Sequence, residues 1–262
     1  MSAPDEAIVD AIASRGTRWL LLLLDFDGTL SEFQTDPAAV RILPGARDAI
    51  ATLVARPRTS VAIVSGRRAE DVRARAELPG SVMYAGFHGF EIQTPDESFL
   101  HPAAAAAVPV LRELRAALEP RLAPLPGVFI EDKGLSIALH DRDADDRARR
   151  DAEALFTAAV EPHVRAGRLR ALRGDRVIEL LPPADWNKGS AVRWLLDRAV
   201  RAHGPVLPVY IGDDVTDEDA FRAIADEGIS IASSTRVTGA QFRVDGPRGV
   251  ERLLRALAMR DA

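Results

Sequence analysis

Trp19-Leu-Leu-Leu-Leu-Leu-Asp25-Phe-Asp27-Gly-Thr-Leu30 is the stretch from which the architecture of this chain can be read. Its first six residues are uniformly apolar, which is typical of a strand buried on both faces of a parallel sheet. The run stops abruptly at Asp25, and a second carboxylate follows at Asp27. Alternation just past a strand end can aim both side chains at one site. We therefore expect a buried central strand with a reactive carboxyl end.

Other apolar runs also end in polar residues. Ser60–Val64 stops at Ser65-Gly66-Arg67, and Val206–Ile211 stops at Gly212-Asp213-Asp214. Helical periodicity appears between these runs, at residues 46–55, 69–78 and 188–202, and again near the end, at residues 250–257. Such alternation predicts an α/β fold with a doubly wound, mostly parallel sheet, whose ligands bind beyond the carboxyl ends of the strands.

Residues 103–183 follow a different pattern. Two helical stretches each precede a hairpin, which predicts an inserted α+β module of order αββαββ. Proline-containing joints flank it, at His101-Pro102 and Pro182-Pro183. We expect a catalytic core domain formed by residues 1–102 and 184–262, and a cap domain formed by residues 103–183.

The composition narrows the class of protein. The 262 residues are 47% hydrophobic and 28% charged, as in soluble globular chains, and they carry a formal net charge of −5. Nucleic acid is therefore a poor candidate partner, because it requires a basic footprint. No apolar run approaches the length of about 20 residues that a membrane span needs. Without cysteines or an N-terminal secretory pattern, a cytoplasmic enzyme is expected, with a monomer as the default state.

The paired carboxylates suggest phosphoryl chemistry. Two neighbouring carboxylates attract a hard divalent cation such as Mg²⁺. Asp25 could attack phosphorus to form an aspartyl phosphate, while Asp27 protonates the leaving oxygen and later activates water. Taken alone, Asp-x-Asp is more often a solvated turn, but here it follows a buried strand and precedes Gly28-Thr29.

Two further segments are suited to binding a phosphate. Ser65 and Gly66 end the second apolar run where a helix begins, so a hydroxyl and backbone N–H groups could bind an anion there. Lys188 opens another helix and is one of only two lysines in an arginine-rich chain, the other being Lys133. A compact ammonium could neutralise both the phosphate and a nucleophilic carboxylate.

Five acidic residues lie within Asp213–Asp219, directly after a buried strand. A bound cation would offset their mutual repulsion. An acidic first helical turn accounts for Glu218 and Asp219, but it accounts poorly for Asp213 and Asp214.

These segments, in this order, resemble the haloacid dehalogenase superfamily of phosphohydrolases over residues 19–92 and 184–262. The resemblance implies Asp25 as nucleophile, Asp27 as general acid and base, and Ser65 and Lys188 on the phosphate. It also implies that Asp25, Asp213 and the backbone carbonyl of Asp27 hold Mg²⁺, supported by Asp214 or Asp217.

A finer resemblance extends to the trehalose-6-phosphate phosphatases and includes the cap. It is carried by four segments: Gly212–Phe221, Tyr84–Glu91, Glu131–His140, and Val177–Pro182 followed by Asn187-Lys188-Gly189. Leu181 and Asp141 depart from that family's common residues, which leaves the sugar contacts open. The substrate-binding residues that it implies are Gly66, Arg67, His88, Glu91, Glu131, Lys133 and Glu179.

The expected reaction is therefore hydrolysis of trehalose 6-phosphate. Several of these residues also have a structural explanation: His88 could be a satisfied core histidine, and the cap residues could be turn and strand-edge residues. The rival functions are a phosphatase for another sugar phosphate, such as sucrose phosphate or glucosylglycerol phosphate, a phosphosugar mutase, and an inactive binding module. The intact set of carboxylates and Lys188 argues against the last.

Overall fold

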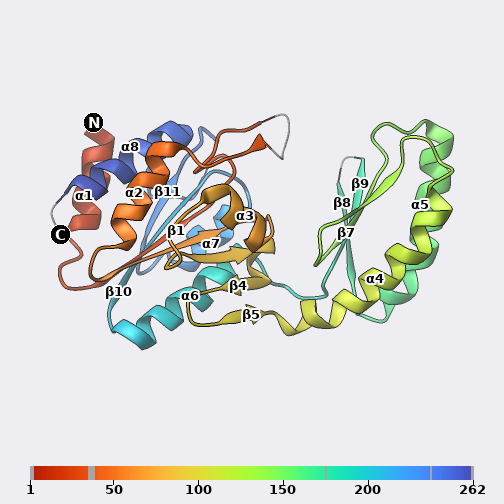
Figure 1. Cartoon of the computed structure of the whole chain (residues 1–262), viewed down its shortest axis with the longest axis horizontal. Coiled ribbons are helices and arrows are strands. Elements are labelled where there is room, and N and C mark those ends of the chain that lie inside the picture. Colours follow the sequence, from red (N-terminus) through yellow and green to blue (C-terminus); the bar gives the residue numbers. More distant parts are fainter. Residues whose placement is uncertain (1–2, 35–38, 175, 237, 261–262) are drawn as a thin grey trace. The chain divides into compact units, whose positions relative to one another are not determined.

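The computed structural model of the chain describes residues 3–34, 39–174, 176–236 and 238–260 (Figure 1). Within these residues, eight strands form one sheet in the order β12-β11-β10-β1-β2-β3-β4-β5. Neighbours from β12 to β3 run parallel, and β3 pairs with β4 antiparallel. The predicted α/β class with a mostly parallel sheet is confirmed. The strands are β1 (Trp19–Leu24), β2 (Thr59–Val64), β3 (Met83–Gly86), β4 (Glu91–Gln93), β5 (Ser98–Leu100), β10 (Val206–Gly212), β11 (Ile229–Ala232) and β12 (Phe242–Arg243).

Alternate residues of β1 enter two separate hydrophobic clusters. Leu20, Leu22 and Leu24 join one cluster, whereas Leu21 and Leu23 join the other. Burying a leucine side chain stabilises a fold by about 1.5–3 kcal/mol, so a leucine run is favoured only where both faces are covered. Helices cover the first face, namely α1 (Ala3–Ala13), α2 (Pro44–Val54), α3 (Ala69–Ala76) and α8 (Gly246–Met259).

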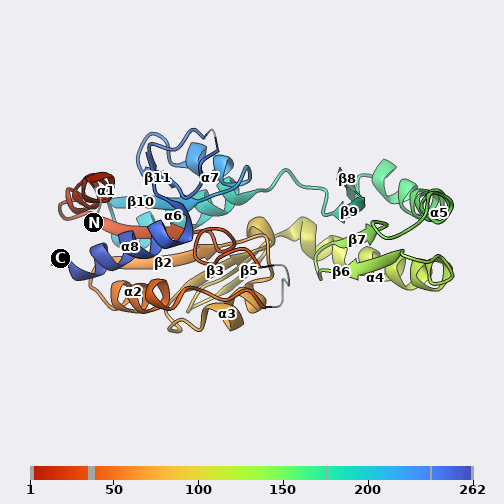
Figure 2. The same cartoon turned by 90° about the horizontal axis from the view of Figure 1, so that it is seen from above.

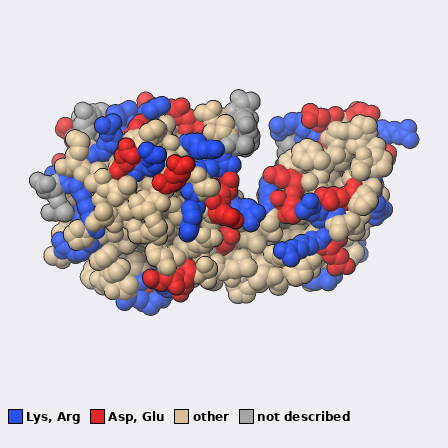
Figure 3. Space-filling view, in the orientation of Figure 1, with Lys and Arg blue, Asp and Glu red and all other residues tan. Residues whose placement is uncertain are grey.

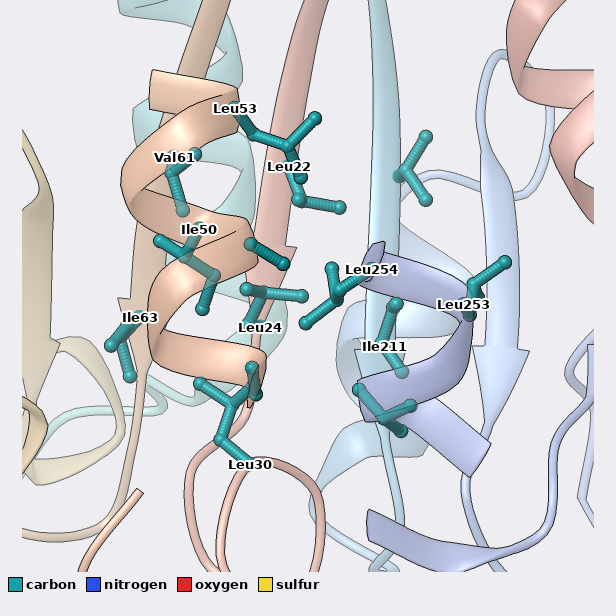
Figure 4. Packing of buried hydrophobic residues seen from close by; sticks show 14 of the residues in the cluster. Leu22, Leu24, Leu30, Ile50, Leu53, Val61, Ile63, Ile211, Leu253 and Leu254 are labelled. Atoms are coloured by element: carbon teal, nitrogen blue, oxygen red, sulfur yellow. The ribbon is translucent and has the colours of Figure 1, made fainter. Parts of the chain in front are cut away.

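Figure 4 shows the first cluster, where Leu22 and Leu24 of β1 meet Ile50 of α2 and Leu254 of α8. On the other face, α6 (Lys188–His203) and α7 (Asp217–Ala223) pack against the sheet. Asn187 caps the start of α6, because its side chain accepts a hydrogen bond from the Ser190 amide at 3.0 Å. This cap places Lys188 at the first position of the helix.

Four further strands form a second sheet, in the order β6-β7-β9-β8 (Figure 2). Its strands are antiparallel, and α4 and α5 supply the other side of its hydrophobic cluster. The chain order of these elements is the predicted αββαββ. Their bounds are α4 (Pro102–Leu122), β6 (Phe129–Asp132), β7 (Ile137–His140), α5 (Asp146–Arg165), β8 (Arg170–Gly174) and β9 (Val177–Leu181).

The chain divides into two compact units. One is formed by Met1–Phe99 with Trp186–Ala262, and the other by Leu100–Asp185. Among the described residues, no helix combines the length and hydrophobicity that crossing a bilayer requires. On the described part of the face in Figure 3, acidic and basic side chains are interspersed over both units.

Candidate active site

The carboxyl ends of three adjacent strands carry the predicted core residues. β1 lies between β10 and β2, so Asp25, Asp213 and Ser65 follow neighbouring strands at one edge of the sheet. The Asp25 amide donates to the Ile211 carbonyl at 2.9 Å, which extends the pairing of β1 with β10 to the first catalytic candidate. The parallel register of the central strands therefore brings these residues together.

Lys188 lies between two buried carboxylates. Its Nζ is 2.7 Å from Asp25 Oδ1 and 2.7 Å from Asp217 Oδ1, and all three side chains are at most 5% exposed. Burial alone would lower the pKa of Lys188, but the charges of Asp25 and Asp217 outweigh burial and raise it. Lys188 is therefore a firmly held cation that fixes the orientation of Asp25.

Both carboxylate oxygens of Asp217 accept hydrogen bonds. Its Oδ1 accepts from Lys188 and from the Tyr210 hydroxyl at 2.7 Å, and its Oδ2 accepts from the Asp213 and Asp214 amides at 2.9 Å. Through these hydrogen bonds, Asp217 holds both Lys188 and the loop after β10 in place. Asp214, by contrast, is exposed, and its carboxylate accepts from the Val215 amide.

The site carries more negative than positive charge. Burial raises the pKa of Asp25 well above its usual range, and the neighbouring Asp217 and Asp213 add to the rise that Lys188 opposes. Burial and the charge of Asp217 likewise raise the pKa of Asp213. A single lysine thus compensates three carboxylates incompletely, which favours either protonation or a cation.

The same three carboxylates could hold a metal ion. Ligand atoms of Asp25, Asp213 and Asp217 lie within 4.8 Å of one another. Because Asp217 already accepts four hydrogen bonds, Asp25 and Asp213 are the side chains better placed to bind a cation directly. Hard carboxylate oxygens with uncompensated charge fit Mg²⁺.

The turn after Asp27 fits closely against Asp213. Gly28 has φ +77°, and a Cβ at this position would lie 2.3 Å from Asp213 Oδ2. Only glycine combines this left-handed backbone with such a close approach. Thr29 Oγ1 donates to Asp213 Oδ1 at 3.2 Å, so this threonine ties the turn to the acidic loop.

Asp27 is paired with Arg67. Arg67 Nε lies 2.7 Å from Asp27 Oδ2, and Arg67 Nη2 lies 2.8 Å from Asp27 Oδ1. We predicted Arg67 as a substrate-binding residue, whereas the structure places its guanidinium on the expected general acid and base. The side chain of Asp27 is 34% exposed, so it remains accessible from solvent.

Ser65, Gly66 and His88 form one loop region. Ser65 is buried, and its Oγ accepts a hydrogen bond from the Arg67 amide at 3.1 Å. A Cβ at Gly66 would lie 2.8 Å from His88 Cε1, so glycine is what allows the imidazole to approach. The His88 amide also donates to the Ser65 carbonyl at 2.8 Å.

Glu91 stabilises the start of α3. Its carboxylate accepts a hydrogen bond from the Ala69 amide at 2.6 Å, which satisfies one of the unpaired N–H groups at a helix N-terminus. The contact gives Glu91 a structural role beside the Ser65–Arg67 loop. The predicted role in substrate binding stays a prediction.

The predicted cap residues lie on or beside β6 and β9, the two strands that flank β7 in the second sheet. Glu131 on β6 and Glu179 on β9 both pair with Ala138 of the strand between them, which puts their side chains on one face. Lys133 Nζ lies 3.3 Å from Glu179 Oε1, and Ser136 Oγ donates to the same oxygen at 2.7 Å. The second sheet therefore presents two carboxylates and an ammonium on a single face.

Sequence reasoning missed several residues of these networks. Tyr210 supports Asp217, His140 Nε2 lies 2.9 Å from Glu131 Oε2, and Arg236 donates to the carbonyls of Asp213 and Asp214. A tyrosine within an otherwise aliphatic buried strand was the one local signal for Tyr210. The Arg236 contacts join segments that no motif connects.

The chain is similar in sequence to proteins of one family. A family model described as trehalose-phosphatase matches residues 23–247. The trehalose-phosphate phosphatases of Mycobacterium tuberculosis strain H37Rv and Mycobacterium marinum are each 41% identical to the chain over 244 residues. Each alignment covers 90% of the chain, which spans 61% of the length of these relatives.

Solved structures share the fold. A trehalose-6-phosphate phosphatase related protein superposes with a TM-score of 0.72 at 24% identity, over 91% of the chain and 97% of its own. Aspergillus fumigatus trehalose-6-phosphate phosphatase gives a TM-score of 0.66 at 24% identity, with 97% of both chains covered. A haloacid dehalogenase-like hydrolase from Bacteroides thetaiotaomicron gives 0.61 at 16% identity, over 92% of the chain and 100% of its own.

Proposed function

The chain belongs to the trehalose-phosphatase family, and we propose that it hydrolyses trehalose 6-phosphate to trehalose and inorganic phosphate. The observation that carries this proposal is the ion-paired Lys188 beside Asp25, at the sheet edge where the neighbouring strand β10 presents Asp213. Such a site pairs a nucleophilic carboxylate with a fixed positive charge, which phosphoryl transfer requires.

In the first step, Asp25 attacks phosphorus. A bond forms between a carboxylate oxygen of Asp25 and phosphorus, and the bond from phosphorus to the sugar oxygen breaks. Asp27 donates a proton to that departing oxygen, so trehalose leaves as an alcohol. Lys188, held 2.7 Å from Asp25, offsets the negative charge that gathers as the phosphate approaches.

In the second step, Asp27 accepts a proton from water. The water oxygen bonds to phosphorus, the bond from phosphorus to Asp25 breaks, and phosphate is released. Asp25 returns as a carboxylate, and Asp27 holds the proton for the next turnover. The buried position of Asp25 limits the access of water to the nucleophile outside this step.

We assign Mg²⁺ to Asp25, Asp213 and the backbone carbonyl of Asp27, with Asp217 supporting the loop. When bound, Mg²⁺ would supply positive charge to the transferring phosphoryl group. The raised pKa values of Asp25 and Asp213, caused first by burial and increased in both by the charge of Asp217, support this assignment.

Metal removal tests the assignment directly. We expect EDTA treatment to abolish phosphate release and added Mg²⁺ to restore it, because the carboxylates left without the cation repel an anionic substrate. Calorimetric titration of Mg²⁺ into metal-free protein should give one site per chain, and Asp213→Asn should lose it. Full turnover by protein shown to be metal-free would remove the cation from the mechanism.

The substrate is tested with a panel of phosphate esters. We expect the highest kcat/KM for trehalose 6-phosphate, against sucrose phosphate, glucosylglycerol phosphate and glucose 6-phosphate, measured as released phosphate. A higher value for one of the other esters would change the assigned substrate but leave the assignment as a phosphatase unchanged. Conversion to an isomeric sugar phosphate without release of phosphate would instead identify a mutase.

A further inference from the structure

Arg67 binds Asp27 through one edge of its guanidinium, formed by Nε and Nη2. Its Nε contacts both carboxylate oxygens, at 3.0 and 2.7 Å, and its Nη2 contacts Oδ1 at 2.8 Å. A two-point contact of this kind fixes both the position and the plane of a carboxylate. The hydrogen bonds to Asp27 raise the pKa of Arg67, so the guanidinium is a permanent cation.

Asp71 lies behind this pair. Its Oδ2 accepts from Arg67 Nη1 at 3.3 Å and from Arg75 Nε at 2.8 Å, so one carboxylate oxygen joins two guanidinium groups. Burial would raise the pKa of Asp71, but its contacts with Arg75 and Arg67 outweigh burial and lower it. The three side chains come from one loop and helix, with Asp71 four residues from each arginine.

Arg75 anchors the far end of the network. Its Nη1 donates to the Val40 carbonyl at 3.2 Å, and its own carbonyl accepts from the Ile42 amide at 3.4 Å. Arg75 is only 14% exposed, against 20% for Arg67. The network therefore runs from the half-buried Arg75, which also hydrogen-bonds to the segment around Val40, to the side chain of Asp27.

We infer that Arg67 and Asp71 are positioning residues that hold Asp27 as the base of the second step, in which the aspartyl phosphate is hydrolysed; this rests on the proposed function. Both oxygens of Asp27 act as acceptors in the contact, as a base requires. In this step a water proton passes to Asp27, the water oxygen bonds to phosphorus, and the bond from phosphorus to Asp25 breaks. Arg67 thereby acts through Asp27 rather than on the phosphate.

The two steps can be separated kinetically with a substrate whose leaving group needs no proton. With p-nitrophenyl phosphate, the leaving group departs without needing a proton, so the first step does not depend on Asp27 as an acid. Loss of the positioning network should then slow only the second step and let the aspartyl phosphate accumulate. A burst of p-nitrophenol, followed by slower steady turnover, reports such accumulation.

Asp71→Asn and Arg67→Lys are the test variants. Asn keeps the size of Asp71 but removes the charge between the arginines, and Lys keeps the charge of Arg67 but cannot bind two oxygens side by side. We expect each to lower kcat for p-nitrophenyl phosphate by about 10- to 100-fold, the scale of a catalytic group misplaced by about 1 Å. KM should fall in proportion and leave kcat/KM unchanged, with a burst near one p-nitrophenol per site.

Glu70→Gln is the matched control. Glu70 precedes Asp71 in the same first turn of α3, and its exposed side chain lies 3.9 Å from Arg68. The change removes the same charge from the same turn without touching Asp27, so kcat and KM should equal those of the wild type. Rapid-quench measurement of the phosphoenzyme should show slow decay in the two test variants alone.

Two results would overturn the inference while leaving the proposed function in place. If both test variants lowered kcat/KM and showed no burst, Arg67 would be a phosphate-binding residue. If the number of active sites fell while the decay of the phosphoenzyme was unchanged, the network would serve folding alone. A wild-type protein that formed no phosphoenzyme would instead remove the proposed function itself, and the inference with it.

Discussion

At the scale of single residues, the main feature of the site is uncompensated negative charge. Asp25, Asp213 and Asp217 share one buried region with Lys188 as their partner cation, and burial raises the pKa of both Asp25 and Asp213. A buried ionised carboxylate lowers the stability of the fold unless it is paired. The arrangement that prepares the site for chemistry therefore costs folding free energy when no cation is bound.

We expect Asp25→Asn to inactivate the protein and to stabilise its metal-free form at pH 7. The folded-state pKa of Asp25 is raised, so its ionised form destabilises the fold above the ordinary pKa of about 3.9. The difference in the free energy of unfolding between variant and wild type should therefore close as the pH falls and Asp25 takes up a proton in both states.

Urea unfolding in EDTA, from pH 4 to pH 8, measures that difference. The exposed Asp48→Asn serves as the control, since its side chain is 72% exposed and should show little dependence on pH. A variant less stable than the wild type at pH 7 would show that the pairing of Asp25 with Lys188 outweighs burial.

At the scale of elements, the loop after β10 is held from two directions. From α7, Asp217 accepts the amides of Asp213 and Asp214. From the segment after β11, Arg236 donates to the carbonyls of the same two residues and to Glu218 Oε1 at 2.7 Å. Amides and carbonyls of one loop are thus fixed by different elements, which orients Asp213 toward Gly28.

Arg236→Ala should weaken Mg²⁺ binding without removing a ligand. The loop would lose its carbonyl contacts, and one charge-assisted hydrogen bond contributes about 1.5–3 kcal/mol, so the Kd should rise by roughly ten-fold or more. Calorimetric titration measures it, with Arg222→Ala on α7 as the control, because Arg222 pairs with Asp219 at the surface. An unchanged Kd would show that Asp217 alone orients the loop.

At the scale of the whole molecule, chemistry and selectivity are expected in different units. The core unit carries Asp25, Asp213 and Lys188, whereas the second unit carries Glu131, Lys133 and Glu179 on one sheet face. Carboxylates accept strong hydrogen bonds from hydroxyl groups, as a sugar would offer. Binding energy from a remote part of the substrate also supports catalysis, so loss of these contacts should lower kcat as well as affinity.

Glu179→Ala should lower kcat/KM for trehalose 6-phosphate by tens-fold. This follows from the loss of about 1.5–3 kcal/mol for a hydrogen bond to a charged group. Turnover of p-nitrophenyl phosphate should be nearly unchanged, since that ester lacks the sugar. Glu113→Ala on α4 is the control, because Glu113 is exposed on a helix of the same unit. Equal losses with both esters would give Glu179 a role in folding or in the core chemistry.

Local pattern accounts for most of what the sequence predicted correctly. Trp19–Leu24 is β1 to the residue, because only a strand covered on both faces tolerates six consecutive apolar residues. The helix expected at residues 188–202 matches α6, Lys188–His203, since its apolar spacing follows the sheet beneath it. α1, Ala3–Ala13, was missed, because its few apolar residues become significant only against α8.

Pairings between distant segments were not predictable from pattern. Arg67 and Asp27 are 40 positions apart, and nothing in either motif indicates that the arginine would pair with this carboxylate. Glu91 likewise lies in a segment predicted to bind substrate, yet it caps α3. Periodicity reports burial, whereas the choice of a charged partner depends on three-dimensional contacts.

The position of β1 between β2 and β10 also has a consequence for synthesis on the ribosome. β1 and β2 are made before the second unit, but β10, which pairs with every residue of β1, follows only after the whole second unit has been translated. Until then the leucine run has one unpaired edge, a state prone to aggregation. We therefore expect the nascent chain to need chaperone protection until β10 has been made, and Lys188 and Asp213 to complete the site only after the second unit has been translated.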